Sequence, residues 1–292
     1  MDFVIWHLKS AVPEEELAIN PGLDIISKTW GFTLSMLFDL QHIAYRHGDK
    51  AVVDDVSISL APGRFYGLIG PNGCGKTTLL DLLIRHRAPA AGTIDFQGKP
   101  LAQWSKKHLA KQIALVPQDF YINFPFSVAE VVMMGRYPHI PRFSAPSDAD
   151  RKIVAEIMDR TAVTSFKNRL ITELSGGERQ RVVFARALAQ ATPVLLLDEA
   201  TSNLDINHAL GLLKVAAELV QKGRKTVVAV MQDINLAAMY CQHLIFMKKG
   251  QLACHGPTEQ VLSDRILREI FQVEARVFVD AYTESRQVVF KK

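Results

Sequence analysis

The chain contains 292 residues, of which 48% are hydrophobic and 22% are charged, and it carries a formal net charge of +4 at pH 7. These values are ordinary for a globular protein with one large domain or two modest ones. Because the net charge is small and the basic residues are scattered, the composition argues against a nucleic-acid-binding protein. The three cysteines lack zinc-ligand spacing, so they indicate a reducing compartment and argue against a disulfide framework.

The N-terminal segment differs from the rest of the chain. Residues 1–35 mix Pro, Gly and acidic positions, and we expect a loosely packed extension that precedes one domain at 36–292. The segment lacks the basic-then-apolar layout of a signal peptide. No other segment approaches the roughly 18 apolar residues that span a bilayer. Any function at a membrane is therefore expected to depend on a partner protein.

Short apolar runs separated by polar turns follow. They predict strands at residues 52–60, 64–69, 113–116, 194–198, 226–230 and 243–247. Helical periodicity is present at residues 76–85, 148–160, 176–190, 206–220 and 235–242. Because strands alternate with helices, we expect a largely parallel α/β sheet. Apolar and polar residues alternate at 37–69 and 92–96 as in antiparallel strands. The pattern at about residues 120–170 predicts a helical subdomain.

A glycine-rich turn lies between the strand predicted at 64–69 and the helix predicted at 76–85. It has the form G-x-x-x-x-G-K-T and consists of Gly70, Pro71, Asn72, Gly73, Cys74, Gly75, Lys76, Thr77 and Thr78. Its glycines permit the positive φ angles that point successive N–H groups at a phosphate. Lys76 is expected to bind the β- and γ-phosphates, and Thr77 to place its hydroxyl on Mg²⁺. The turn therefore predicts binding of ATP with Mg²⁺.

Two further features lie downstream of this turn. Asp198 and Glu199 follow an apolar run, so a buried strand carries both carboxylates to the carboxyl edge of the sheet, where such sheets bind ligands. A second glycine turn opens the helix predicted at 176–190 and consists of Ser175, Gly176, Gly177 and Glu178. Ser175 is expected to cap this helix, and the glycine pair allows the close approach of an anion.

These motifs, in this order, resemble those of an ABC transporter ATPase over roughly residues 37–292. The resemblance implies an α/β fold: a P-loop ABC ATPase cassette with a RecA-like core, an antiparallel β subdomain and a helical subdomain. It implies that Asp198 orders Mg²⁺ and that Glu199 polarises the attacking water. Gln118, after the strand at 113–116, matches the family glutamine that touches Mg²⁺ and this water.

The resemblance also implies a composite site between two copies of the chain. In the family, the turn that corresponds to Ser175, Gly176, Gly177 and Glu178 contacts the γ-phosphate held by the partner subunit's phosphate loop. Two ATP molecules then lie in a head-to-tail homodimer with two-fold symmetry. Ser202 and Asp205 match the turn that lies across the dimer seam. Glu178 stands where the family often has Gln.

Two departures from the family pattern concern residues near the nucleotide. Gln232 stands where the family usually has a histidine, and an amide can donate a hydrogen bond to the γ-phosphate but cannot carry a charge or move a proton. The aromatic residue that stacks on adenine is expected at His47, although Tyr45 lies on the same face of a strand and is the alternative. Gln232 can instead cap the next helix and face solvent.

The residues after Gln118 resemble one branch of the family. Residues 124–139 and the C-terminal tail at about 256–292 are similar to the ATPases of importers for iron–siderophores, haem and cobalamin. This implies a homodimer on the cytoplasmic face of the cell (inner) membrane, bound to two permease subunits, with an external substrate-binding protein acting indirectly. Two alternatives stay open: a soluble ABC ATPase without a transport role, and a regulator that binds ATP but hydrolyses it slowly.

Overall fold

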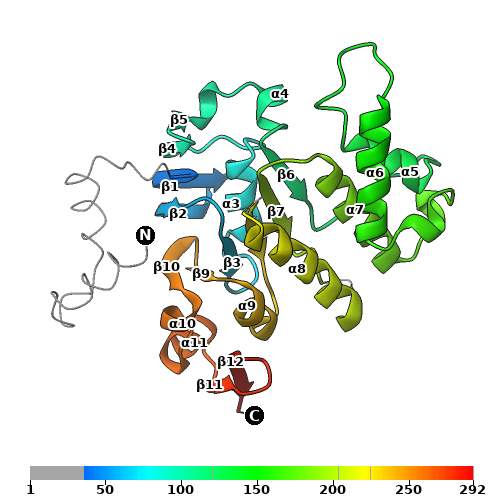
Figure 1. Ribbon diagram of the computed structural model, residues 1–292. Helices are drawn as coiled ribbons and strands as arrows, with labels where there is room; N and C mark the ends of the chain where they lie inside the picture. The colour runs from blue at the N-terminus through cyan, green and yellow to red at the C-terminus, as the bar shows by residue number, and fades with distance from the viewer. Residues whose placement is uncertain (1–35, 121, 203, 224, 292) are drawn as a thin grey trace, which may run out of the picture. The chain divides into compact units, whose positions relative to one another are not determined.

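The computed structural model describes residues 36–291, apart from residues 121, 203 and 224. The N-terminal extension expected at residues 1–35 lies outside the described residues. A six-stranded sheet forms the centre of the described unit, with the strand order β10-β9-β3-β8-β7-β6 (Figure 1). The strands are β3 (Phe65–Ile69), β6 (Ile113–Val116), β7 (Val194–Asp198), β8 (Thr226–Val230), β9 (His243–Lys248) and β10 (Gln251–Pro257).

This sheet is parallel except at β10, which pairs antiparallel with β9. Every residue of β3, β7 and β8 is buried. The sequences of these strands are continuously apolar because the central strands of a covered parallel sheet are buried on both faces. The largely parallel sheet that the sequence predicts is therefore confirmed.

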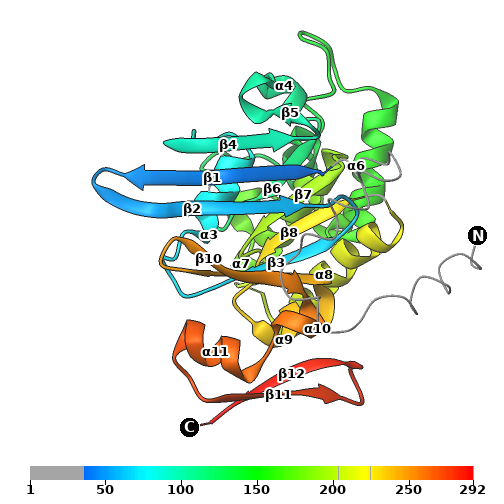
Figure 2. The same cartoon turned by 90° about the vertical axis from the view of Figure 1, so that its left-hand side faces the viewer.

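A four-stranded antiparallel sheet is formed by strands that lie before and after β3 in the chain, with the order β2-β1-β4-β5. Its strands are β1 (Phe38–His47), β2 (Lys50–Leu60), β4 (Ala91–Phe96) and β5 (Lys99–Pro100). Figure 2 shows β4, β1 and β2 stacked side by side. The sequence pattern assigned all of 37–69 to antiparallel strands, and that assignment is wrong for β3. β3 pairs in parallel with β8 and β9 because it has two apolar faces to cover.

The alternating side chains of the central sheet contribute to two hydrophobic cores. On one face, Phe65 and Leu195 pack with α7 (Gly176–Ala189), α8 (Ile206–Gln221) and α9 (Ile234–Tyr240). On the other face, Leu68 and Leu196 pack with α3 (Lys76–Leu83) and the antiparallel sheet. Two short helices, η2 (Leu101–Gln103) and α4 (Lys106–Leu109), join β5 to β6.

The helical subdomain has a third core of its own. It contains α5 (Val128–Met134), α6 (Asp148–Arg160), η3 (Thr164–Phe166) and η4 (Ile171–Glu173), packed on the face of α7 that carries Val182, Ala185 and Ala189. Ser127 and Ser147 begin α5 and α6 with capping boxes. Arg136 holds the two helices together, because its Nε lies 2.9 Å from Oδ1 of the nearly buried Asp150. Figure 1 shows this subdomain at one end of the central sheet.

The C-terminal tail folds as a regular unit that the sequence pattern did not resolve into elements. α10 (Thr258–Val261) and α11 (Asp264–Phe271) are followed by a hairpin of β11 (Ala275–Asp280) and β12 (Ser285–Phe290). The hairpin forms a separate two-stranded sheet and β12 packs on α9 (Figure 2). Among residues 36–291, apart from the three gaps, no helix has the length and apolar character that crossing a bilayer requires.

Candidate nucleotide site

A cavity of about 310 Å³ lies at the carboxyl end of the central strands. Its lining combines the glycine-rich turn with side chains that follow β6, β7 and β8. These residues are Val52, Asn72, Gly73, Gly75, Lys76, Thr77, Thr78, Gln118, Glu199 and Gln232. The structure therefore brings together residues that are more than 150 positions apart in sequence. Val52, on β2, is a lining residue that the sequence analysis missed, because its side chain carries no chemical signal.

Two glycines of the turn, Gly70 and Gly75, are required by close backbone contacts. A Cβ atom on Gly70 would lie 2.2 Å from the carbonyl oxygen of Met247. Gly75 has a φ of +103°, and a Cβ there would lie 2.5 Å from the carbonyl oxygen of Val52. A Cβ atom on Gly250, in the β9–β10 turn, would lie 2.8 Å from the same Val52 oxygen. The Gly250 N–H donates to the Cys74 carbonyl at 3.1 Å. The turn is thus fixed between both sheets.

Lys76 is the first residue of α3 and is only 6% exposed. Its Nζ donates to the carbonyl oxygens of Gly70, at 2.8 Å, and Pro71, at 3.1 Å. The ammonium group is therefore held inside the turn, where the N-terminal end of α3 also attracts negative charge. Phosphate oxygens entering this cradle would find a buried cation and free N–H groups, which is the chemistry that the motif predicts.

Asp198 ends β7 and is 4% exposed. Thr77 donates through Oγ1 to its Oδ1 over 3.1 Å. Burial raises the pKa of the Asp198 carboxyl group to about 6, with a smaller contribution from the charge of Glu199. A hydroxyl and a carboxylate fit Mg²⁺, which prefers oxygen ligands and completes its shell with phosphate oxygens and water. A nearby divalent cation would offset the cost of ionising Asp198.

The raised pKa of Asp198 has a measurable consequence for stability. The folded chain keeps the carboxyl proton up to about pH 6, whereas the unfolded chain loses it near 3.8. The favourable contribution of the neutral carboxyl group is therefore complete below pH 4 and is lost as the pH rises through 6. Without nucleotide and Mg²⁺, we expect Asp198→Asn to raise the free energy of unfolding at pH 8 by on the order of 2 kcal/mol relative to its effect at pH 4. Urea denaturation at both pH values checks this, and an equal effect at both would contradict it.

Glu199 follows Asp198 and adopts a φ of +48°. This left-handed conformation is uncommon for a residue with a long side chain and costs energy that the surrounding structure must supply. Gln118 donates through Nε2 to Glu199 Oε2 over 3.0 Å, and Gln232 Nε2 donates to the same oxygen. Ser202 donates through Oγ to the Glu199 carbonyl over 2.9 Å. Gln118 and Gln232, which the sequence analysis places near the nucleotide, therefore both contact the Glu199 carboxylate directly.

Gln232 lies in the turn between β8 and α9. Asp233, not Gln232, is the N-cap of α9 and accepts hydrogen bonds from the N–H groups of Asn235, at 2.8 Å, and Leu236, at 3.0 Å. The amide of Gln232 points to Glu199, and the residue lines the cavity. The structure thus favours the site location over the capping alternative, while the catalytic role of Gln232 stays a prediction.

The second glycine turn lies outside this cavity. Ser175 caps α7, and its N–H and hydroxyl both donate to Oε2 of Glu178, at 2.9 and 2.8 Å. These hydrogen bonds hold the pKa of the Glu178 carboxyl group below its usual value. Glu178 thus completes a capping box in which Glu and Gln are interchangeable. Ser175 and Gly176 are exposed, and a Cβ on Gly176 would meet no atom within 4 Å.

Three other predicted residues also lie away from the cavity lining. Asp205 is exposed and caps α8, accepting from the His208 N–H over 2.9 Å. His47 is exposed at the end of β1, whereas Tyr45 is half-buried. The Tyr45 hydroxyl accepts from Arg87 over 2.7 Å, and the guanidinium carbon lies 5.4 Å from the ring centroid. Tyr45 is therefore already packed, and the choice between Tyr45 and His47 as the adenine-stacking residue stays a prediction.

The glycine-rich cradle, the strand-end carboxylates and the glutamines that contact Glu199 define a P-loop nucleotide-binding cassette. A family model described as ABC transporter matches residues 53–202. The chain therefore belongs to the ABC transporter family, and it has the ATP-binding cassette fold that the sequence predicts.

Proteins related by sequence have import functions. The cobalamin import ATP-binding protein BtuD of Halobacterium salinarum is 41% identical over 248 residues, which cover 85% of this chain and 62% of BtuD. The iron(3+)-hydroxamate import ATP-binding protein FhuC of Bacillus subtilis is 37% identical over 83% of this chain and 90% of FhuC. The chain thus matches about three fifths of the length of the first relative and most of the second. The predicted resemblance to the importer branch is confirmed.

Solved structures agree with this assignment. A metal-chelate type ABC transporter in an inward-facing conformation matches with a TM-score of 0.76 and 28% identity, over 88% of this chain and 98% of that chain. A dimeric ATP-binding cassette in a post-hydrolysis state, bound to ADP and Pi, matches with a TM-score of 0.68 and 26% identity, over 76% of this chain and 98% of that one. The fold class is therefore confirmed.

Proposed function

We propose that the chain is the ATP-hydrolysing subunit of an ABC importer. The observation that carries this proposal is the convergence of Lys76, Thr77, Gln118, Glu199 and Gln232 on one cavity. Lys76 and the turn amides bind the phosphates, while Thr77 and Asp198 are the groups that would hold Mg²⁺. Bound Mg²⁺ neutralises charge on the phosphate oxygens. The import functions of the relatives support the coupling of this site to uptake.

Glu199 is the proposed general base of the reaction. Gln118 and Gln232 both donate to Oε2, so they orient the carboxylate and leave the other oxygen, Oε1, available for a water molecule. Glu199 then accepts a proton as the oxygen of this water bonds to the γ-phosphorus, while the bond from the γ-phosphorus to the β–γ bridging oxygen breaks and leaves ADP and phosphate as products. The strained φ of Glu199 fixes the direction of the carboxylate and reduces the reorganisation that the step requires.

The working unit is proposed to be a homodimer. The exposed turn at Ser175 and Gly176 does not line the cavity of its own chain, so it is available for the nucleotide of a second copy. The dimeric cassette with ADP and Pi supports this arrangement. Ser202 and Asp205 are proposed to lie at the seam between the two copies.

A test of the composite site uses Ser175→Arg. The bulky cation is expected to prevent closure onto the partner's ATP and to lower turnover by at least about tenfold, while ATP affinity in the chain's own turn is unchanged. Turnover is measured with ATP in excess, and affinity by nucleotide titration of the monomer. Ser165→Arg, a substitution at an exposed residue of η3, is the matched control and should retain turnover. Wild-type turnover in Ser175→Arg would contradict the dimer.

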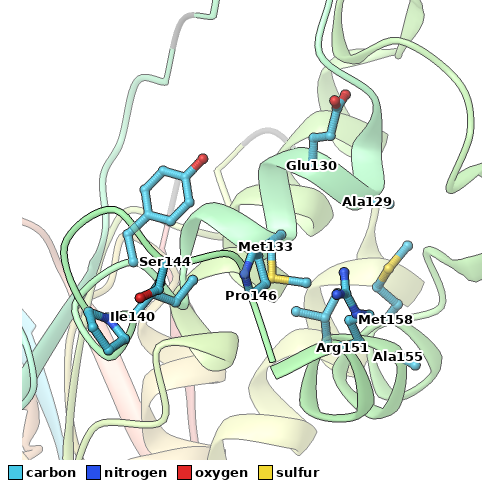
Figure 3. Close-up of a pocket in the computed structure, with 12 residues that line it drawn as sticks. Ala129, Glu130, Met133, Ile140, Ser144, Pro146, Arg151, Ala155 and Met158 are labelled. Carbon is cyan, nitrogen blue, oxygen red and sulfur yellow. The ribbon is translucent and has the colours of Figure 1, made fainter. Parts of the chain in front are cut away.

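The helical subdomain contains the proposed docking site for a permease subunit. A cavity of about 800 Å³ opens between α5, α6 and the loop that joins them. Figure 3 shows Met133 of α5 and Met158 of α6 on its walls, with Glu130 and Arg151 supplying charge. Flexible thioether side chains adapt to an inserted apolar segment, and an amphipathic helix in such a groove is a common mode of binding. A short cytoplasmic helix of the permease is the proposed occupant.

This docking site is tested with Met133→Glu. Burying the new carboxylate under an apolar segment is unfavourable, so we expect permease binding to weaken by at least about tenfold while ATP hydrolysis by the isolated subunit is retained. Co-purification with the co-expressed permease measures the binding. Met239→Glu, on the exposed side of α9, is the control and should bind normally. Equal binding by both variants would contradict the location.

The proposed cargo is a metal chelate: an iron–siderophore, haem or cobalamin. The names of the relatives support this class. The cassette itself is proposed to have no contact with the cargo. The proposed location is the cytoplasmic face of the cell (inner) membrane, with two permease subunits and an external binding protein delivering cargo. Uptake of labelled ferric hydroxamate, haem and cobalamin by a deletion strain, with and without the restored gene, tests the proposal. Restoration of none of the three would contradict it.

Gln232 favours one alternative function, that of a slow nucleotide-dependent regulator. An amide in place of the usual histidine cannot carry charge, so the rate of ATP turnover distinguishes the importer subunit from the regulator. Steady-state hydrolysis by the purified chain at about 1 s⁻¹ or faster would exclude the regulator. A strong rise in turnover on addition of permease and cargo-loaded binding protein would support the importer.

A further inference from the structure

The outer edge of the C-terminal hairpin is bound by one side chain of α9. Val288 on β12 pairs with Val277 on β11. Its other neighbour is Asn235: the Val288 N–H donates to Asn235 Oδ1 over 2.7 Å, and Asn235 Nδ2 donates to the Val288 carbonyl over 3.3 Å. An edge strand normally leaves such groups to solvent or to another strand. The Asn235 amide occupies the place that a third strand would take.

Asn235 also stands three residues after Gln232. α9 has seven residues, which is too short to be stable through its own hydrogen bonds. β12 is the element that α9 contacts most extensively, and Val288 is 4% exposed. On the other side of Gln232, the Met231 N–H donates to the Leu68 carbonyl over 3.1 Å, which fixes that residue to the central sheet. The segment that carries Gln232 is therefore held at both ends, by β3 on one side and by the hairpin on the other.

We infer that Asn235 is a positioning residue for hydrolysis and that the C-terminal hairpin, through Val288, holds the Gln232 amide against Glu199. The inference rests on the proposed role of Gln232 in the site. If the link is broken, the first turn of α9 can shift, and the Gln232 amide loses its fixed contact with Oε2 of Glu199. The phosphate cradle is on a different segment and is unaffected. The effect should therefore fall on turnover and not on nucleotide affinity.

The first experiment is steady-state ATP hydrolysis by the full chain. Asn235→Ala removes both hydrogen bonds to Val288 and is expected to lower kcat by about three- to tenfold, with KM for ATP changed by less than about twofold. Asn235→Asp keeps an acceptor for the Val288 N–H and should lose less. Arg286→Ala is the control, because the side-chain hydrogen bond of Arg286 joins β12 to the Leu262 carbonyl over 2.6 Å and not to α9. Its kcat should match that of the wild type, and an equal loss in this control would overturn the inference.

A double-mutant cycle with Gln232→Ala separates this coupling from a general loss of stability. If Asn235 acts through Gln232, Asn235→Ala should cause no further loss of kcat in the Gln232→Ala background, whereas independent effects would multiply. Multiplying effects, or an unchanged kcat in a folded Asn235→Ala variant, would overturn the hairpin coupling alone. An unchanged kcat in Gln232→Ala would overturn the role of Gln232 and the inference with it.

A measurement that does not depend on ATP hydrolysis completes the test. Hydrogen exchange of the amides at 232–237 should speed up in Asn235→Ala, and it should stay at the wild-type rate in Arg286→Ala. This measurement remains available for any variant that folds but does not hydrolyse ATP. Wild-type protection of these amides in Asn235→Ala would overturn the inference, because α9 would then be held without the hairpin.

Discussion

Replacement of Glu199 by Gln is expected to slow ATP hydrolysis by about 10²–10⁴-fold, because an amide cannot accept the proton of the attacking water. The side chain keeps its size, and its carbonyl oxygen can still accept from Gln118 and Gln232, so the geometry of the cavity should be retained. ATP hydrolysis under single-turnover conditions measures the chemical step directly.

Binding of ATP provides the control for this variant. Affinity should be close to that of the wild type, because the phosphate cradle is intact, and unhydrolysed ATP should hold two copies together. Gel filtration with and without ATP checks this accumulation of dimer. Hydrolysis at the wild-type rate, or a variant that stays monomeric with ATP, would contradict the proposed base and the composite site, respectively.

The second large effect is expected for Lys76→Ala. The ammonium group is buried and donates to two carbonyl oxygens of the turn, and with nucleotide bound it would donate to phosphate. Each charge-assisted hydrogen bond contributes about 1.5–3 kcal/mol, so ATP affinity should fall by more than about 100-fold. Equilibrium binding of a fluorescent ATP analogue measures the loss.

Lys214→Ala, at an exposed position of α8, is the matched control for the loss of a lysine and should bind ATP normally. Both variants should give the wild-type circular dichroism spectrum, because the core clusters do not contain either lysine. Undiminished ATP binding by a folded Lys76→Ala variant would contradict the assignment of the phosphate cradle.

The sequence predicts the phosphate cradle well because its function depends on local backbone geometry. Gly70 and Gly75 are fixed by contacts that exclude a Cβ atom, so the spacing of the motif encodes the turn itself. The position of Asp198 and Glu199 follows from a buried strand that ends at the ligand-binding edge. For these parts, residue type and local structure carry the same information.

Other features depend on contacts between distant segments and could not be predicted from local pattern. β11 and β12 are half-exposed strands whose stability comes from each other and from α9, so neither has the strong alternation of an independent strand. Val52 lines the cavity through its position alone. The large groove of the helical subdomain is likewise made by the packing of α5 against α6, although its methionines are visible in the sequence.

The close approach of Gly75 and Gly250 to the Val52 carbonyl makes nucleotide affinity a property of more than the phosphate cradle. The Asp54 N–H donates to the Gly250 carbonyl over 2.9 Å, so the β1–β2 hairpin, the cradle and the β9–β10 turn share their contacts. Binding of ATP stabilises the cradle, and through these shared contacts part of the binding free energy also stabilises the attachment of the β1–β2 hairpin. By reciprocity, a substitution that loosens the hairpin far from any phosphate must weaken ATP binding by the same coupling free energy.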